Sequence, residues 1–216
     1  MTLALEEIWP IFGLKISTPR LDLAPLRDQD FPGLVEAALK GIHSPELTPF
    51  GSPWTDAEPK DLARNLVSYQ WSLRNKVMPN NWTIVFGIHH NNQIIGVQDL
   101  SVRDFRNRLT VNSGSWLTQD KQGLGLGTEM RAGVLMFAFD ILNANWAESS
   151  AAAWNKASLT VSQKLGYELN GITRVSPRDG QPEDEQRVRL SKNNFQRPSW
   201  NIKIQGHEKA LAQLGL

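Results

Sequence analysis

The sequence has no cysteine in its 216 residues. The chain therefore forms no disulfide, thiolate metal site or cysteine nucleophile, and this composition fits a cytoplasmic protein. Histidine is also scarce. Of the four histidines, only His89 and His90 are adjacent, which makes a poor cluster of metal ligands. We therefore expect no metal ion in the functional site.

An excess of charge of one sign and long apolar runs are lacking as well. The chain carries 23 Lys plus Arg and 22 Asp plus Glu, a formal net charge of +1, whereas nucleic-acid-binding proteins are strongly basic. No run approaches the roughly 18 apolar residues of a membrane span, and Glu6 and Glu7 stand where a signal peptide would be positive. We expect an unexported protein that binds neither nucleic acid nor membrane. A homodimer is left open.

The pattern of apolar residues predicts a mixed α/β protein. We expect helices over 28–41, 61–75, 126–141 and 155–166, and strands over 18–26, 81–90, 93–102, 110–117, 146–154, 167–175 and 185–191. Hydrophobic residues make up 40% of the chain, enough to fill one core. We predict a single domain over 1–195, with a strand and short helix at 196–216 packed on it.

Three glycines alternate in QGLGLG, residues 122–127, between a predicted strand and a predicted helix. No lysine follows them as in a Walker loop, and the G-x-G-x-x-G spacing would place Thr128 or Met130 at its third glycine. The helix N-terminus still offers free N–H groups and a dipole that can bind a pyrophosphate. The alternative is a flexible connection that binds no ligand.

Two motifs resemble one known family. QGLGLG matches Q/R-x-x-G-x-G/A, the pyrophosphate signature of the GNAT acyl-CoA N-acyltransferases. The segment N-x-x-S-x(5)-K-x-G-F/Y of the branch with the ribosomal-protein N-terminal acetyltransferases is matched by Asn155, Ser158, Lys164, Gly166 and Tyr167. TPRLDLAPL also resembles the opening of that branch, and PWT, SGSWL and QGLGLGTEMRA resemble an actinobacterial subgroup. Residues 15–195 are thereby identified as a member of this family.

The resemblance implies the GNAT α/β fold, with a central mixed, mostly antiparallel sheet splayed at its fourth and fifth strands and helices on both faces. Acyl-CoA would lie in the resulting V, its pantetheine pairing with the backbone near Trp116 and Leu117. Its diphosphate would bind the amides of Gln122, Gly123, Leu124, Gly125, Leu126, Gly127 and Thr128. Asn155 would bind the pantetheine, cap the following helix, or do both.

The implied reaction moves an acyl group directly from acetyl-CoA, or from another acyl-CoA such as succinyl-CoA, to a primary amine. The acceptor would be a protein N-terminus, a lysine or a small molecule. A sensor or scaffold domain that binds acyl-CoA without turnover is the alternative, because two catalytic side chains common in the family are absent. Ser162 stands at the position of a thiolate-protonating tyrosine, and Asn112 stands at the position of a glutamate.

Substitutes for both missing groups are available in the sequence. Ser158 matches a serine proposed to face the cofactor sulfur, so we assign it as donor to the thiolate; a capping or solvated serine is the alternative. Asp99 lies within the apolar segment IIGVQDLSV and is our candidate base, unless it faces solvent. His43 is the second candidate. Glu129 is expected to support the helix N-terminus rather than react.

Acceptor binding is predicted for the proline-rich loop after the first helix, which keeps His43, Phe50 and Trp54. The connection at 173–185 is expected to contribute. The predicted hairpin turn RDFRNR, at 103–108, concentrates three arginines. Either it reaches a carboxylate on the acyl group or acceptor, or it is a solvated turn.

Overall fold

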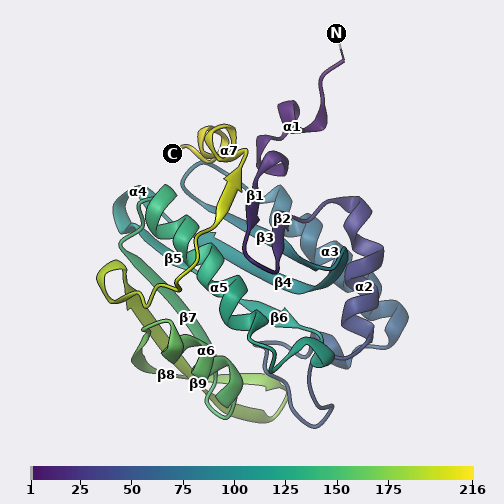
Figure 1. Ribbon diagram of the computed structural model, residues 1–216. Coiled ribbons are helices and arrows are strands. Elements are labelled where there is room, and N and C mark those ends of the chain that lie inside the picture. The colour runs from purple at the N-terminus through teal and green to yellow at the C-terminus, as the bar shows by residue number, and fades with distance from the viewer. Residues whose placement is uncertain (1) are drawn as a thin grey trace.

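The computed structural model describes residues 2–216, whose strands form one ten-stranded sheet (Figure 1). The strands are β1 (Lys15–Ser17), β2 (Asp22–Pro25), β3 (Trp82–His90), β4 (Gln93–Val102), β5 (Thr110–Asn112), β6 (Ser115–Leu117), β7 (Trp146–Ala152), β8 (Glu168–Arg178), β9 (Gln181–Ser191) and β10 (Lys203–Gln205). Their order is β10-β1-β2-β3-β4-β5-β7-β9-β8, with β6 also on β4. Only β5 and β7 pair in parallel, which confirms the predicted mixed, mostly antiparallel sheet.

Helices cover both faces of the sheet, as predicted. They are α1 (Leu5–Ile8), α2 (Phe31–Leu39), α3 (Pro59–Asn75), α4 (Phe105–Arg108), α5 (Leu126–Met136), α6 (Lys156–Lys164) and α7 (His207–Leu214). Short 3₁₀ turns are η1 (Pro10–Gly13), η2 (Asp28–Asp30), η3 (Trp54–Asp56), η4 (Gln119–Lys121) and η6 (Lys192–Asn194), and α5 continues into the π-helical turn η5 (Phe137–Ile141). In residues 2–216, no helix has the length and hydropathy that a membrane span requires.

Two hydrophobic clusters hold these layers together. On one face, Leu34 of α2 and Leu62 and Leu66 of α3 pack against Val97 of β4. On the other face, α5 and η5 join the larger cluster, which includes Leu100 of β4. Because side chains alternate along a strand, Asp99 lies on the same face of β4 as Val97, the face that α2 and α3 cover.

The strand predicted over 110–117 is interrupted. Its register on β4 breaks between Asn112 and Ser115, which separates β5 from β6. At the break, the Gly114 N–H donates to Asp99 Oδ1 at 2.9 Å, and the Gly114 carbonyl accepts from the Asp99 N–H at 2.8 Å. A Cβ at Gly114 would lie 2.8 Å from Asp99 Oδ2, so a larger residue there would displace the carboxylate from this contact. The prediction of one continuous strand was wrong, because the Gly114 N–H binds the Asp99 side chain instead of a backbone carbonyl of a neighbouring strand.

One loop prediction was also wrong. The connection expected at 173–185 is the distal part of the long β8–β9 hairpin, which turns only at Asp179 and Gly180. The arginine-rich segment joins the antiparallel strands β4 and β5, as the predicted hairpin turn requires, and it folds as the short helix α4, which the buried Phe105 (1% exposed) anchors in the core. At the C-terminus, β10 pairs with β1 and α7 packs against η1.

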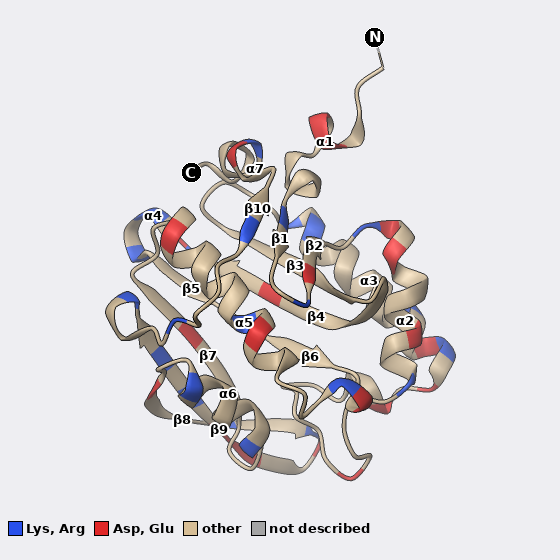
Figure 2. Ribbon diagram, in the orientation of Figure 1, with Lys and Arg blue, Asp and Glu red and all other residues tan. Residues whose placement is uncertain are grey.

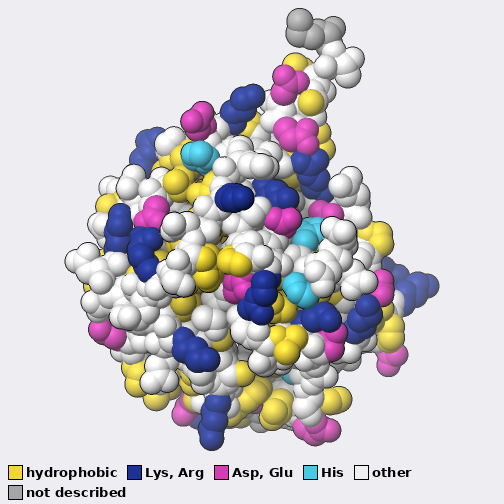
Figure 3. Space-filling model, viewed as in Figure 1, with side chains coloured by type: hydrophobic (Ala, Val, Ile, Leu, Met, Phe, Trp, Pro, Cys, Tyr) yellow, Lys and Arg dark blue, Asp and Glu magenta, His cyan; other side chains and the backbone are white. Residues whose placement is uncertain are grey.

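Charges are dispersed over the molecule. Basic and acidic residues are scattered as short segments over the ribbon (Figure 2), and the face in view in Figure 3 mixes both signs with apolar side chains. This distribution agrees with the net charge of +1. Within residues 2–216, no group of three or more His, Cys, Asp or Glu could hold a metal ion.

Candidate active site

The strands β6 and β7 diverge to form a V. Their parallel pairing, through β5, ends at Asn112 and Glu148, and β6 then pairs with β4 alone. The Thr118 N–H donates to the Ile95 carbonyl at 2.9 Å. Successive N–H groups of a strand point to opposite edges, so the Leu117 N–H points into the V. This free edge offers a backbone donor to a ligand lying between the strands.

The glycine turn ends at the N-terminus of α5. Gly125 is the N-cap in the left-handed region (φ 81°), and Gly123 is also left-handed (φ 73°). The first intrahelical bond runs from Glu129 N to the Gly125 carbonyl at 3.1 Å. The N–H groups of residues 126–128 therefore have no helical partner and can bind an anion.

Side chains fix this turn against the sheet. Gln122 Nε2 donates to the carbonyls of Leu117 (2.8 Å) and Ile42 (2.7 Å). The buried Glu129 accepts from the Thr18 hydroxyl at 2.7 Å and from Arg20 Nε at 2.6 Å. Glu129 thus supports the helix N-terminus, and its two oxygens are occupied by this link to the segment between β1 and β2.

The N-x-x-S motif, formed by Asn155 and Ser158 at the start of α6, lies across the V from β6. Asn155 caps α6, because its Oδ1 accepts from the Ser158 N–H at 3.1 Å. This is the capping role considered above, and it leaves the Asn155 Nδ2 for a ligand. Ser158 is half-buried. Ser162, at the position of the absent tyrosine, is 3% exposed, and its hydroxyl donates to the Ser158 carbonyl at 3.2 Å.

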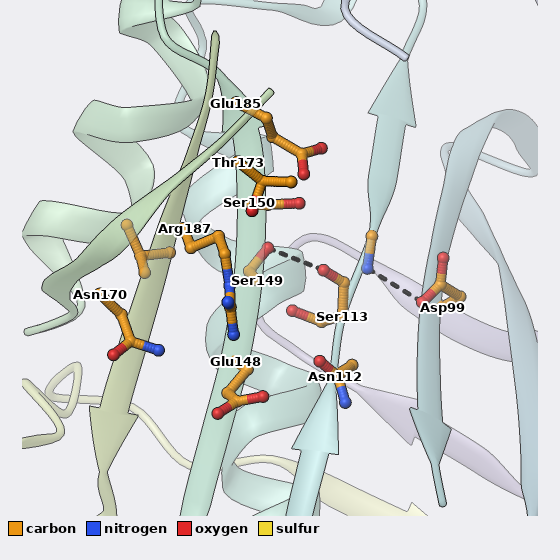
Figure 4. Close-up of a pocket in the computed structure, with 12 residues that line it drawn as sticks. Asp99, Asn112, Ser113, Glu148, Ser149, Ser150, Asn170, Thr173, Glu185 and Arg187 are labelled. Atoms are coloured by element: carbon orange, nitrogen blue, oxygen red, sulfur yellow. Dashed lines mark hydrogen bonds between the residues drawn. The ribbon is translucent and has the colours of Figure 1, made fainter. Parts of the chain in front are cut away.

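A polar cavity of about 410 Å³ opens on the face of the sheet that α2 and α3 cover elsewhere. Asp99 reaches it from β4, while Arg187 reaches it from β9 on the far side (Figure 4). The lining carboxylates Glu148 and Glu185 outnumber the cations there, so the cavity favours a positively charged ligand. The glycine turn lies on the α5 side, so the two regions approach the V from opposite faces.

Among the carboxyl groups that line this cavity, Asp99 has a shifted pKa. Burial raises the pKa of Asp99 to about 6, against opposing effects of the Gly114 N–H and of Arg131. Its side chain keeps partial access to the cavity. A carboxyl group with such a pKa is ionised at neutral pH and basic enough to accept a proton.

Glu148 is a site residue that the sequence analysis missed. It is the register partner of Asn112 and lines the same cavity as Asp99. Its Oε1 lies 3.9 Å from Arg189 Nε, whose guanidinium stacks at 3.7 Å on the Trp146 ring. The available signal was an acidic residue in the predicted strand 146–154, the same kind of signal that singled out Asp99.

The proline-rich loop packs as an aromatic row. Phe50 lies between His43 and Trp54, with ring centroids at 5.6 and 5.1 Å, and Trp54 lies 6.0 Å from Trp116 of β6. His43 Nε2 is 2.8 Å from the Thr55 hydroxyl. Trp54 is thereby packed against the strand that borders the V, and His43 is separated from the V by these rings.

Arg178 connects this loop to the β8–β9 hairpin. Its Nε and Nη2 donate to Asp56 at 2.7 and 2.9 Å, and its guanidinium also donates to the carbonyls of Pro45 and Glu46. Charge-assisted bidentate bonds of this kind fix geometry. The loop and the hairpin tip, far apart in the sequence, are therefore held together at the edge of the V.

The arginine turn lies away from the V. Arg106 donates to the Gly215 carbonyl at 2.6 and 3.2 Å, and Leu109 accepts from Asn145 just beyond η5. Residues 126–141 separate this end from the glycine turn, roughly 24 Å at the rise of a helix (Figure 1). The geometry favours the solvated-turn interpretation over a clamp for the acyl group.

We predict that the arginine turn does not select the acyl donor. The ratio of the dissociation constants for succinyl-CoA and acetyl-CoA is expected to stay within about twofold in Arg103→Ala, Arg106→Ala and Arg108→Ala, since a lost charge-assisted bond would change it by tenfold or more. Calorimetry measures this ratio. A selective loss of succinyl-CoA binding in one variant would instead support the interpretation that this arginine binds the carboxylate of the acyl group.

Comparison with known proteins matches this chain to one family model and to solved structures of similar fold. A family model described as "Acetyltransferase (GNAT) domain" matches residues 20–168. RimJ from Mycobacterium smegmatis, in complex with CoA-disulfide, aligns with a TM-score of 0.68 at 16% identity, covering 93% of this chain and 92% of that one. The ribosomal α-N-protein acetyltransferase RimL in complex with coenzyme A aligns with a TM-score of 0.66 at 15% identity, covering 81% and 95%. At these identities the two structures are similar in fold.

Proposed function

Because the chain belongs to the acetyltransferase (GNAT) family, we propose that it transfers an acyl group, in the first place acetyl, from acyl-CoA directly to a primary amine. The acceptor classes are a protein N-terminus, a lysine side chain or a small molecule. The observation that carries the proposal is the V between β6 and β7, with the glycine turn on one face and the acidic cavity on the other. Acyl-CoA and the amine would thus reach the V from opposite faces of the sheet.

The residues present fit an acyl-CoA. The N–H groups of the turn from Gln122 to Thr128 would hold its diphosphate, and a Cβ at Gly127 would lie 3.9 Å from Leu117 and 3.8 Å from Val161, on the two sides of the V. A Cβ would fit there at ordinary contact distance, whereas a larger side chain would enter the passage that pantetheine would use. The bound thioester supplies the activated acyl carbon. Trp116, Leu117 and Asn155 would bind its pantetheine arm.

The chain's own groups can meet the needs of acyl transfer. Asp99 would accept the proton that the amine loses, and the Leu117 N–H would donate to the carbonyl oxygen as it gains negative charge. Ser158, half-buried at the start of α6, would donate to the thiolate. Glu148 and Glu185 would attract the ammonium form of the acceptor into the cavity.

Steady-state release of CoA tests this function. Acetyl-CoA and succinyl-CoA are each supplied with a panel of amines: peptides with free N-termini, peptides with lysine as the only amine, and small amines. We expect CoA release above the rate of hydrolysis with at least one class. Tight binding of acyl-CoA without release across the panel would favour the sensor or scaffold role.

Trp54→Ala is expected to raise the KM for the acceptor and to leave the dissociation constant of CoA within about twofold, because the loop borders the cavity side of the V. Trp71→Ala is the matched control, since Trp71 is an exposed tryptophan of the neighbouring α3 whose indole N–H donates to Asp28. Kinetics with varied acceptor and calorimetry with CoA measure the two quantities. An acceptor KM that is unchanged in Trp54→Ala would remove the loop from the acceptor site.

A further inference from the structure

Arg131 is a buried arginine that the reaction described above does not use. It projects from α5, one helical turn after Gly127, and it is 4% exposed. Among the ion pairs formed by residues 2–216, none includes Arg131. A buried guanidinium without a carboxylate partner is costly, so its position calls for a reason.

The guanidinium bridges the two sides of the V. Its Nη2 donates to the Ser115 hydroxyl on β6 at 3.3 Å, and its Nη1 donates to the Ser162 hydroxyl on α6 at 3.1 Å. Both partners are neutral hydroxyls, and the Nε has no hydrogen-bond partner among the described residues. The positive charge is therefore not neutralised by direct contact, and it lies where the strands separate.

Two further polar groups with unused hydrogen-bonding capacity lie near it. Tyr167 Oη and Ser113 Oγ are buried and have no partner that meets hydrogen-bond geometry in the described chain. Burial raises the pKa of Tyr167, while Arg131 and Ser113 act in the opposite direction, so Tyr167 stays a neutral phenol at neutral pH. Asp99 of β4 is the titratable carboxyl group that also feels the charge of Arg131. This cluster is built around an excess of positive charge.

We propose that Arg131 supplies the positive charge that stabilises the thiolate of CoA as it leaves, an inference that rests on the proposed function. In that step the amine nitrogen forms a bond to the acyl carbon, the carbon–sulfur bond breaks, and the sulfur keeps the bonding electron pair. The proton lost by the amine passes to Asp99 and from there to solvent, and the thiolate, which accepts a hydrogen bond from Ser158, later takes a proton from solvent. A fixed cation in a water-poor site opposes the charge that develops on sulfur far better than water-exposed charges do.

The test measures the acidity of the thiol of bound CoA, with reduced CoA as the probe. Ultraviolet absorbance of the thiolate is followed against pH in the protein–CoA complex, and the complex with desulfo-CoA serves as the blank. In the wild type we expect a thiol pKa at least one unit below the ordinary value of about 8.5. In Arg131→Met the pKa should rise by one unit or more, and kcat should fall by about 10²-fold.

Two further variants separate charge from hydrogen bonding and from folding. Arg131→Gln keeps donors for Ser115 and Ser162 but removes the charge, so it should behave as Arg131→Met does. Arg131→Lys keeps the charge and should retain at least half of the shift in thiol pKa. Thermal unfolding of the Met variant should be unchanged or higher, because an unpaired buried charge has been removed.

The outcomes distinguish this inference from the function on which it rests. An equal thiol pKa in the wild type and in Arg131→Met overturns the role of Arg131 alone. An unshifted thiol pKa together with selective loss of succinyl-CoA binding would overturn it too and would assign Arg131 to a carboxylate on the acyl group. Failure of the wild type to bind CoA would overturn the proposed function and this inference together.

Discussion

Replacing Asp99 by asparagine is expected to lower kcat by about 10²-fold or more, the usual effect of losing a general base. Asparagine is close in shape and can still accept the bond from the Gly114 N–H through its Oδ1, so the break between β5 and β6 should persist. CoA affinity should be nearly unchanged, because the glycine turn lies on the opposite face. Single-turnover kinetics and calorimetry measure the two effects separately.

The pH dependence of the rate tests whether Asp99 is the base. Since burial raises the pKa of Asp99 to about 6, kcat/KM of the wild type should rise with pH through that value and level off above it. Asp99→Asn should lose this step, whereas Glu148→Gln should keep it. An unchanged kcat in Asp99→Asn would mean that water or another group removes the proton, or that the amine arrives neutral.

The same shift has a consequence for folding. The pKa of Asp99 lies at about 6 in the folded chain, above its ordinary value of 3.8, so the folded state binds the proton more tightly than the unfolded state does. This contribution to stability is complete below about pH 4 and is lost as pH rises through about 6. As pH rises through this interval, Asp99→Asn should therefore become more stable relative to the wild type, although the variant loses activity.

Gly127→Val is expected to weaken CoA binding by about 10-fold to 100-fold, the value of one charge-assisted contact to a phosphate. The valine methyl groups would project between Leu117 and Val161, where the passage through the V begins. Gly127→Ala is the graded control, since its Cβ meets only ordinary contact distances of 3.8 and 3.9 Å. Calorimetry with CoA measures both variants.

Gly125 is a poorer choice for this test. Its φ of 81° is left-handed, so a valine there would strain the turn whether or not a phosphate binds. Gly127 lies within α5, where β-branched residues cost only a fraction of a kcal/mol. Unchanged CoA affinity in Gly127→Val, with native circular dichroism, would contradict the assignment of the glycine turn.

Local patterns in the sequence predicted most of the fold. The helix over 126–141 and the helix over 155–166 were recognisable because their apolar residues recur at helical intervals, and β3 and β4 because their residues are β-branched and apolar. The glycine turn was recognisable because its spacing, with a strand before and a helix after it, is local. Each of these features depends on residues close together in the chain.

Features that depend on distant residues were missed. The break at Gly114 arises from the Asp99 side chain fifteen residues away, and the Arg178 contact joins residues more than 120 positions apart. Arg131 looks like an ordinary charged residue on a helix until β6 and α6 are placed beside it. Glu148 acquires its neighbours only through the parallel pairing of β5 with β7.

The position of the V across the sheet has a consequence for the kinetic order. The glycine turn opens on the α5 face and the cavity at Asp99 on the face of α2 and α3, so neither substrate has to leave before the other enters. The chain has no cysteine to carry an acyl group between two half-reactions. Initial rates at several fixed concentrations of each substrate should therefore give intersecting double-reciprocal lines, the pattern of a ternary complex, rather than the parallel lines of a ping-pong enzyme.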